Sequence, residues 1–255
     1  MSPNPLRRPR GWLSDARAVV EPRLWARPLT ARDALICFSS HIFQRLEESL
    51  DLQHASTEVR LPAAVQSRVS ECFALVDCYF GAPAAGMLLE TLIASGVERV
   101  WMVAQAGAVS RRCRIGDLFI PTWGLREEGT SYHYLPPYAR PQPSEECLEL
   151  LRHMLRDRPA EEGGIWSIDA PFRETEDKVR RYSRRGVRAV DMECSALMAI
   201  CQVRGVRFGA VMTITDELHG EHWKSGFDSA PVLASQSLMC ERLAAALAPA
   251  GSSQT

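Results

Sequence analysis

Two carboxylates in this chain stand where an α/β protein presents its ligand-binding groups. Asp216 ends a largely apolar segment that begins at Val206, and Glu193 lies between the short apolar run 187–190 and a helix pattern. Carboxyl groups at the carboxyl ends of buried strands bind ligands and exchange protons with them. Each residue also has a purely structural interpretation. Asp216 would then cap the following turn, and Glu193 would complement a helix dipole from the first turn.

Several common catalytic motifs are missing from the sequence. It contains no G-x-G-x-x-G, no G-x-x-x-x-G-K-[ST], no H-E-x-x-H and no G-x-S-x-G. Dinucleotide binding, P-loop nucleotide hydrolysis, zinc proteolysis and serine hydrolysis therefore have no motif support. The sequence suggests neither a metal site nor an organic cofactor.

The elements that must position these carboxylates alternate along the chain between short apolar runs and amphipathic patterns. Helix patterns are predicted over 83–94, 145–155, 174–185, 194–203 and 232–247. Strands are predicted over 34–38, 72–76, 100–103, 118–121, 187–190 and 206–213. This alternation predicts a single α/β domain, with a mixed, mostly parallel β-sheet flanked by helices. We place it at residues 31–248, after a Pro/Arg-rich arm (1–30) and before a flexible tail (249–255).

Composition narrows the class of protein. The 255 residues are 46% hydrophobic and 24% charged with a net charge of −1, which excludes a coiled coil and argues against a nucleic-acid partner. No uncharged apolar run approaches the roughly 18 residues of a membrane span. The basic first ten residues are not followed by the apolar stretch of a signal peptide. We therefore expect a cytoplasmic protein without a membrane partner, whose eight unpatterned cysteines are reduced.

Four segments taken together resemble the nucleoside phosphorylase superfamily, which includes purine nucleoside phosphorylases, uridine phosphorylases and nucleosidases. Any one of them alone is weak, but they occur in the family's order and spacing. The third segment, Arg-Glu-Glu-Gly-Thr-Ser-Tyr-His-Tyr-Leu-Pro, is typical of the uridine-phosphorylase-like branch. The segments are 81–97, 104–121, 126–136, and the pair 190–197 with 213–218.

The resemblance implies roles for the two carboxylates. Cleavage of an N-glycosidic bond creates an oxocarbenium-like sugar and places negative charge on the departing base. By resemblance, Asp216 is the acid that protonates or hydrogen-bonds this base, with Thr215 beside it. Glu193 would accept hydrogen bonds from the ribose hydroxyls while Met192 packs on the sugar.

The phosphate site departs from the family pattern. Where phosphorylases have a Gly-Asp-Pro turn with a nearby Arg, this chain has Phe-Ser-Ser-His-Ile-Phe-Gln at 38–44. Met102 stands in place of a second Arg, and Gln105 replaces a hydroxyl residue, although Gly107 is retained. The phosphate ligands expected from the resemblance are Ser39, Ser40, Gln105 and Gly107, with orthophosphate as co-substrate rather than a bound cofactor.

Three interpretations of this departure stay open. The chain phosphorolyses a nucleoside with substitute ligands, hydrolyses it with water, or binds it without catalysis. A nucleosidase of this fold has a Glu just after the first strand, and none stands there. His41 is the titratable group at that place, either as a base near neutral pH or as a polar residue at a strand end.

The sequence gives the weakest indication of which residues contact the base and which contact a partner subunit. Phe172 is a candidate stacking ring and Arg173 a candidate polar contact, although residues of both types more often serve packing or the surface. His133 is a candidate for a ligand contact or a subunit interface. The resemblance implies a homo-oligomer (a dimer, trimer or hexamer) and a purine or pyrimidine nucleoside as the small-molecule partner.

Overall fold

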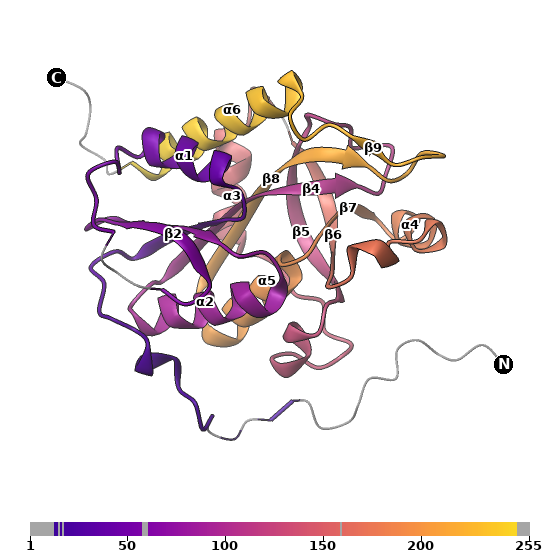
Figure 1. Cartoon of the computed structure of the whole chain (residues 1–255). Coiled ribbons are helices and arrows are strands. Elements are labelled where there is room, and N and C mark those ends of the chain that lie inside the picture. The colour runs from indigo at the N-terminus through magenta and orange to yellow at the C-terminus, as the bar shows by residue number, and fades with distance from the viewer. Residues whose placement is uncertain (1–12, 15, 17, 58–60, 159, 249–255) are drawn as a thin grey trace.

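The fold was analysed in a computed structural model, which describes residues 13–14, 16, 18–57, 61–158 and 160–248. A nine-stranded sheet forms its centre (Figure 1). Strand β4 pairs with three neighbours, β1, β7 and β8, so that β4, β7, β6, β5 and β8 close into a ring while β1, β3 and β2 extend from it. In spatial order the strands are β2 (Ala64–Val69), β3 (Phe73–Cys78), β1 (Asp33–Cys37), β4 (Arg99–Ala108), β7 (Val187–Asp191), β6 (Glu161–Ile168), β5 (Leu118–Glu127), β8 (Arg207–Glu217) and β9 (Lys224–Ser225).

Helices cover both faces of the open part of the sheet (Figure 1). Along β1, Ala34 and Ile36 join one apolar cluster with α2 and α5, whereas Leu35 and Cys37 join another with α1, α3 and α6. Side chains alternate between the faces of a strand, so a strand covered on both faces is apolar throughout. The helices are α1 (Ser40–Ser49), α2 (Ala82–Ala94), α3 (Glu145–Met154), α4 (Glu176–Ser183), α5 (Cys194–Arg204) and α6 (Ala230–Leu247), with 3-10 turns η1 (Pro22–Leu24), η2 (Thr130–His133) and η3 (Pro171–Arg173).

The predicted fold class is confirmed, and each predicted strand and helix is present. Strands β2 and β6 and helix α1 were not predicted, nor were the short strand β9 and the 3-10 turns. Strand β2 is a half-buried edge strand containing Gln66 and Arg68, and β6 begins with the polar sequence Glu-Glu-Gly-Gly. Neither therefore shows the apolar run of a central strand. Helix α1 begins at Ser40, so His41 lies in the first turn of a helix and not in a strand-end loop.

The predicted N-terminal arm is described only in part, and the predicted tail 249–255 lies outside the described residues. The backbone N–H of Leu29 donates to the carbonyl of Ser95 at 2.8 Å. The Leu29 side chain packs against the apolar cluster shared with α2 and α5. The end of the arm is therefore attached to its own domain. All eight cysteines are free, and no helix of the described residues is long and apolar enough to cross a membrane.

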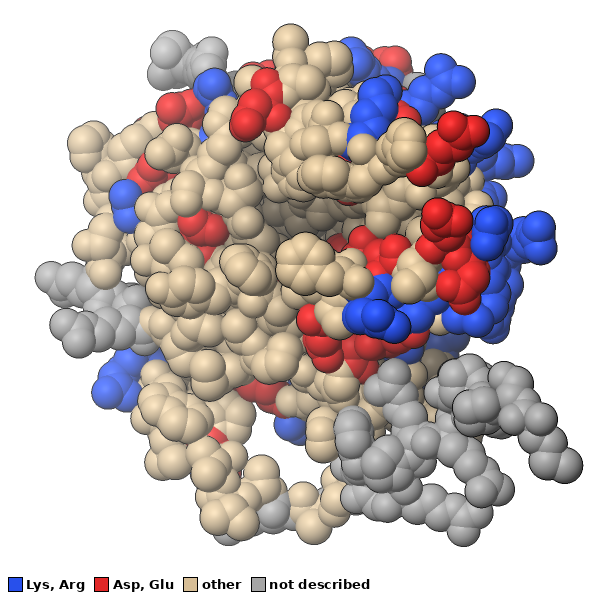
Figure 2. Space-filling view, turned by 45° about the vertical axis from the view of Figure 1, so that its right-hand side comes forward, with Lys and Arg blue, Asp and Glu red and all other residues tan. Residues whose placement is uncertain are grey.

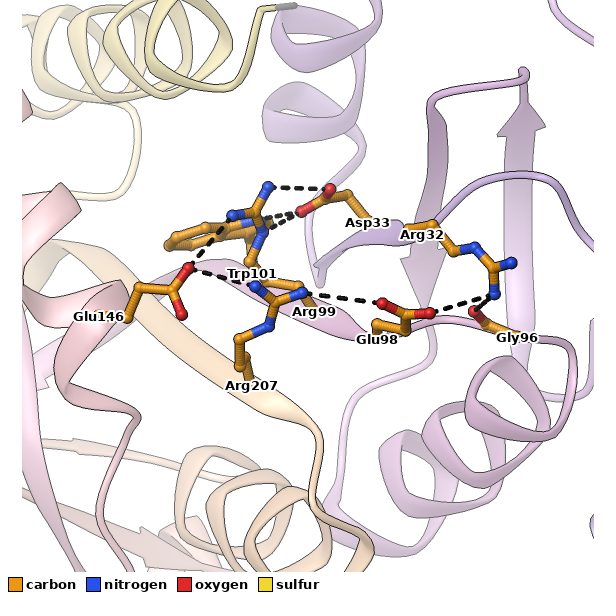
Figure 3. Close-up of polar contacts among 8 residues, drawn as sticks. All are labelled: Arg32, Asp33, Gly96, Glu98, Arg99, Trp101, Glu146 and Arg207. Carbon is orange, nitrogen blue, oxygen red and sulfur yellow. Dashed lines mark hydrogen bonds and ion pairs between the residues drawn. The ribbon is translucent and has the colours of Figure 1, made fainter.

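An ion-pair network ties together the amino ends of the central strands. Asp33, the first residue of β1, accepts hydrogen bonds from Arg99 Nε at 2.5 Å, Arg99 Nη2 at 3.0 Å and Trp101 Nε1 at 2.9 Å. The bidentate geometry holds β1 and β4 in register at this edge. The ion pairs continue outward through Glu146, Arg207, Glu98 and Arg32 (Figure 3).

Candidate active site

A cavity of about 770 Å³ lies at the opposite end of these strands from the ion-pair network. The strand register explains its position, because Gly107 of β4 lies beside Val190 of β7 on one side and Asp216 of β8 on the other. The loops after β1, β3, β6 and β8 and the first turns of α4 supply the rest of the wall. The lining residues are Phe38, Phe80, Ala104, Gln105, Ala106, Gly107, Pro171, Phe172, Glu174, Glu176, Val179, Val190, Asp191, Met192, Glu193, Thr215, Asp216, Leu218, Gly220, Glu221, His222, Trp223 and Phe227.

Asp216 is held in the cavity wall by two side chains. Trp223 Nε1 donates to Oδ2 at 2.8 Å, and Thr215 Oγ1 donates to Oδ1 at 3.0 Å. Burial raises the pKa of this carboxyl, and the two donors oppose that rise by stabilising its ionised form. The carboxylate is bonded by cavity side chains, which favours the ligand-binding interpretation of Asp216 over the turn cap.

Gly107 makes room for this carboxylate. A Cβ at position 107 would lie 2.9 Å from Asp216 Oδ2 and 2.6 Å from Leu218 Cδ1. Both distances are shorter than real Cβ contacts allow. A larger residue here would therefore displace the Asp216 carboxylate and the Leu218 side chain, whether or not phosphate binds there.

Asp191 and Glu193 share the join between β7 and α5. Asp191 Oδ2 accepts the backbone N–H groups of Glu193 at 3.2 Å and Cys194 at 2.7 Å, and its Oδ1 accepts the Ser167 hydroxyl at 2.5 Å. Asp191 thus supplies the acceptor that the first N–H groups of α5 need. The Glu193 side chain therefore does not cap α5.

The Glu193 side chain reaches across to another loop. Its Oε1 accepts the backbone N–H of Gly81 at 2.5 Å, at the start of α2. Burial and the neighbouring Asp191 raise the pKa of Glu193 to about 8. Met192 lies beside it in the cavity wall, so the predicted ribose pair is brought together.

Glu174 is a cavity carboxyl that the sequence interpretation missed. It follows η3 directly and lines the cavity. Burial, together with the charges of Asp216 and Asp191, raises its pKa to about 7. Carboxyls shifted toward neutrality are able to donate and accept protons at physiological pH, and they concentrate in catalytic sites.

The cavity wall is strongly acidic. Six of its lining residues are Asp or Glu, and among the described lining residues there is no Lys or Arg. Figure 2 shows the hollow in this face, with Asp and Glu gathered along one side of it and Lys and Arg further out. Carboxylates raise the cost of placing a phosphate dianion in this cavity.

The predicted phosphate ligands are separated in the structure. Gln105 and Gly107 line the cavity, whereas Ser39 and Ser40 do not. Ser40 Oγ donates to Asp77 Oδ2 at 3.1 Å, so this hydroxyl already serves a buried carboxylate. The Ser-Ser-His sequence that stands in place of a Gly-Asp-Pro turn coincides with the start of α1.

His41 and Met102, like Ser39 and Ser40, do not line the cavity. His41 lies in α1, half-buried and outside the cavity wall, and its Nε2 has no hydrogen-bond partner within the described structure. Met102 is fully buried in β4 and packs in the cluster with α2 and α5.

The predicted base-binding residues behave differently from one another. Phe172 is 99% exposed at the mouth of the cavity, and Thr215 is buried in its wall. Arg173 is exposed and lies outside the cavity lining. His133 lies in η2 and lines a separate, smaller cavity of about 520 Å³ beside α2, together with Tyr134 and Glu90.

Trp223 and Phe227 were also missed by the sequence interpretation. Both lie in the segment after β8 and line the cavity. The available signal was composition, because a Trp within the polar stretch His-Gly-Glu-His-Trp-Lys-Ser is unusual for a purely solvated loop. Such a ring needs a partner for its N–H and its faces.

The Arg-Glu-Glu-Gly-Thr-Ser segment (126–131) forms hydrogen bonds behind the cavity wall. The fully buried Glu128 accepts hydrogen bonds from the Ser131 backbone N–H at 2.8 Å and from the Ser195 hydroxyl of α5 at 3.0 Å. Arg126 Nε donates to Ser131 Oγ at 2.8 Å. The segment therefore anchors α5, whose start carries Glu193.

Comparison with known proteins places this geometry among related enzymes. The family model described as "Phosphorylase superfamily" matches residues 33–249. A guanosine phosphorylase of Halorubrum lacusprofundi is 30% identical over 151 residues, covering 58% of this chain and 62% of that protein. The chain likewise spans less than two thirds of a uridine phosphorylase of Haemophilus influenzae and of a purine nucleoside phosphorylase of Shewanella oneidensis.

Solved structures share the fold at low sequence identity. A uridine phosphorylase from Vibrio fischeri superposes with a TM-score of 0.65 at 21% identity, covering 93% of this chain and 97% of that one. A 5'-methylthioadenosine/S-adenosyl homocysteine nucleosidase from Campylobacter jejuni gives a TM-score of 0.69 at 17% identity, covering 85% and 98%. The same architecture thus occurs in proteins named for phosphorolysis and in proteins named for hydrolysis.

Proposed function

Since the chain belongs to the phosphorylase superfamily, we propose that it cleaves the N-glycosidic bond of a nucleoside and transfers the ribosyl group to water. The observation that carries the choice of water is the acidic cavity, whose described lining offers no Lys or Arg to a phosphate dianion. A neutral nucleophile meets no such electrostatic cost.

The cavity residues fit the two ends of such a substrate. We assign assistance of the departing base to Asp216, a carboxyl group in the cavity wall whose pKa is raised by burial. We assign the ribose to Glu193 and Met192, which also line the cavity. As the bond from C1′ to the base breaks, the sugar acquires oxocarbenium character, which neighbouring carboxylates stabilise.

Water then attacks C1′ and loses a proton. Asp191 and Glu193, on the ribose side, are the carboxyl groups proposed to receive it. Glu174 lies close enough to Asp216 and Asp191 for their charges to raise its pKa, so it is a second proton carrier at the base end. General acid–base assistance of this kind contributes about 10²–10⁴-fold to the rate.

Phosphorolysis is the second candidate, and the relatives' names favour it. The chain is 30% identical to a guanosine phosphorylase over 151 residues, and Gln105 and the retained Gly107 line the cavity. In this case orthophosphate would enter beside Gln105. Ser39 and Ser40 would have to turn toward the cavity to contribute.

The test is product analysis with and without phosphate. Phosphate-free protein is incubated with purine, pyrimidine and 5′-modified nucleosides in H₂¹⁸O, and free base and labelled ribose are quantified by chromatography and mass spectrometry. Equal base release in both arms, with ¹⁸O at C1 of the ribose, is expected. Base released only with phosphate, as ribose 1-phosphate, would establish phosphorolysis. No release from any nucleoside would leave the non-catalytic binding interpretation, and Asp216→Asn serves as the inactive control.

A further inference from the structure

We propose that this cavity selects nucleosides whose base carries a positive charge. The inference rests on the proposed function, because it takes the Asp216 end of the cavity as the base end. It goes further by naming the charge class of the substrate.

The first support is the charge of the cavity wall. Its six carboxyl groups belong to Glu174, Glu176, Asp191, Glu193, Asp216 and Glu221. Glu174 and Glu193, with pKa values raised to about 7 and about 8, carry only part of a charge at pH 7. His222 is the one basic side chain among the described lining residues. A cleft walled by one sign of charge concentrates ligands of the opposite sign, more so when apolar walls reduce screening.

The second support is where the carboxylates gather. Besides burial, the charge of Asp216, and after it that of Asp191, raises the pKa of Glu174, so Glu174 adds a second carboxyl group near the Asp216 end of the cavity. Lys178, whose charge also acts on Glu174 and lowers its pKa, does not line the cavity and pairs with Glu127 at 2.9 Å.

The third support is aromatic. Phe38, Phe80, Phe172, Trp223 and Phe227 all line the cavity, and Phe172 and Phe80 are 99% and 73% exposed at its rim. Aromatic faces attract cations, and they do so together with carboxylates in sites that recognise quaternary nitrogen. Rings at the rim of an acidic cavity fit a flat, positively charged heterocycle better than a neutral polar one.

The chemistry balances for such a substrate. The bond between C1′ and the ring nitrogen breaks, and its electron pair returns to that nitrogen and neutralises the positive charge. Water adds to C1′ and releases a proton, so the products are a neutral base, ribose and H⁺. The positive charge moves from base to sugar during this step, and the cavity carboxylates stabilise it throughout.

A matched pair of ligands tests the inference directly. Nicotinamide riboside carries a pyridinium ring, and benzamide riboside is its neutral isostere with carbon in place of the ring nitrogen. Dissociation constants for both are measured by isothermal titration calorimetry at pH 7. The cation is expected to bind at least tenfold more tightly, equivalent to about 1.4 kcal/mol. Raising NaCl from 0.05 to 0.5 M is expected to reduce the ratio severalfold.

Variants test whether the cavity carboxyl groups cause the preference for the cationic ligand. Glu174→Gln and Asp216→Asn should each lower the affinity ratio severalfold. Glu149→Gln, which removes one charge from an exposed position on α3, should leave it unchanged. Equal affinities for the two ligands in the wild-type protein, or a ratio insensitive to salt, would overturn the inference.

Failure of this inference is distinguishable from failure of the proposed function. Base release from neutral nucleosides combined with equal affinities refutes the charge selectivity and leaves the cleavage activity standing. Strong preference for the cation without any base release supports the selectivity and refutes the cleavage activity.

Discussion

Replacement of Gly107 by Ala tests whether the position of the Asp216 carboxylate limits catalysis. The added methyl carbon would lie 2.9 Å from Asp216 Oδ2, where ordinary contact begins at 3.4 Å. The carboxylate must therefore retreat by about 0.5 Å, and Leu218 by more, since its Cδ1 is 2.6 Å away. Misplacement of a reacting group by about 1 Å costs on the order of 10²-fold, so a loss of about tenfold in kcat/KM is expected.

The same substitution overpacks the cavity wall, and its effect on stability must be measured separately. Overpacking typically costs about 1–3 kcal/mol of unfolding free energy. Gly205→Ala is the matched control, because a Cβ there meets nothing within 4 Å and the cost comes only from the left-handed φ of +68° at the end of α5. That variant should lose stability and keep kcat/KM.

The readouts are initial rates of base release, with a nucleoside that the wild-type protein cleaves, and thermal melting followed by circular dichroism. The double variant Gly107→Ala/Leu218→Ala removes the contact with Leu218 and keeps the contact with Asp216, so it should remain slow. Full activity in Gly107→Ala would refute the assignment of Asp216. Full recovery in the double variant would assign the loss to Leu218 instead.

Three further predictions concern Trp223, Asp33 and Glu174. Trp223→Phe removes the N–H donor that stabilises ionised Asp216, so the pKa of Asp216 should rise further. The alkaline limb of the kcat/KM profile should then move to higher pH. An unchanged limb would show that this hydrogen bond does not set the pKa of Asp216. Asp33→Asn weakens the partly buried bond to Arg99, and it should cost about 1–2 kcal/mol in urea unfolding while leaving kcat/KM unchanged. Glu174 has its pKa raised from 4.5 to about 7, so the native state binds more protons than the unfolded state in that window, and the wild-type free energy of unfolding falls as pH rises through it. Glu174→Gln does not titrate, and its stability relative to wild type should therefore be greater at pH 8 than at pH 5; an equal difference at both pH values would contradict the shift.

Strand and helix periodicity sufficed to predict most of the fold. The central strands are covered on both faces, so their apolar runs are continuous and easily seen, as at 34–38 and 206–213. Strand β2 escaped prediction because an edge strand keeps polar residues on its open side. Helix α1 escaped because its first turn follows β1 with almost no linker, and its polar positions resemble a loop.

The cavity could be predicted in outline from strand ends. Asp216, Glu193 and Thr215 end or follow strands, and the register of β4 with β7 and β8 brings them together with Gly107. Side-chain contacts between distant loops have no such signal. The position of Glu174 in the sequence does not show that the charge of Asp216 will act on it. That interaction depends on how the loop after β6 folds over the cavity.

The closure of the strand ring sets the order in which this site can form during folding. β4 is complete at residue 108, yet its partner β8 pairs with it from Arg207 onward, 108 positions after Arg99. Until that late segment arrives, one edge of β4 is unpaired and apolar, which invites association with other chains. A chain released before β8 is made lacks both the closing strand and the eight cavity-lining residues from Thr215 to Phe227. Slow, long-range pairing of this kind makes dependence on chaperones and loss of truncated products the expected behaviour of this protein in the cell.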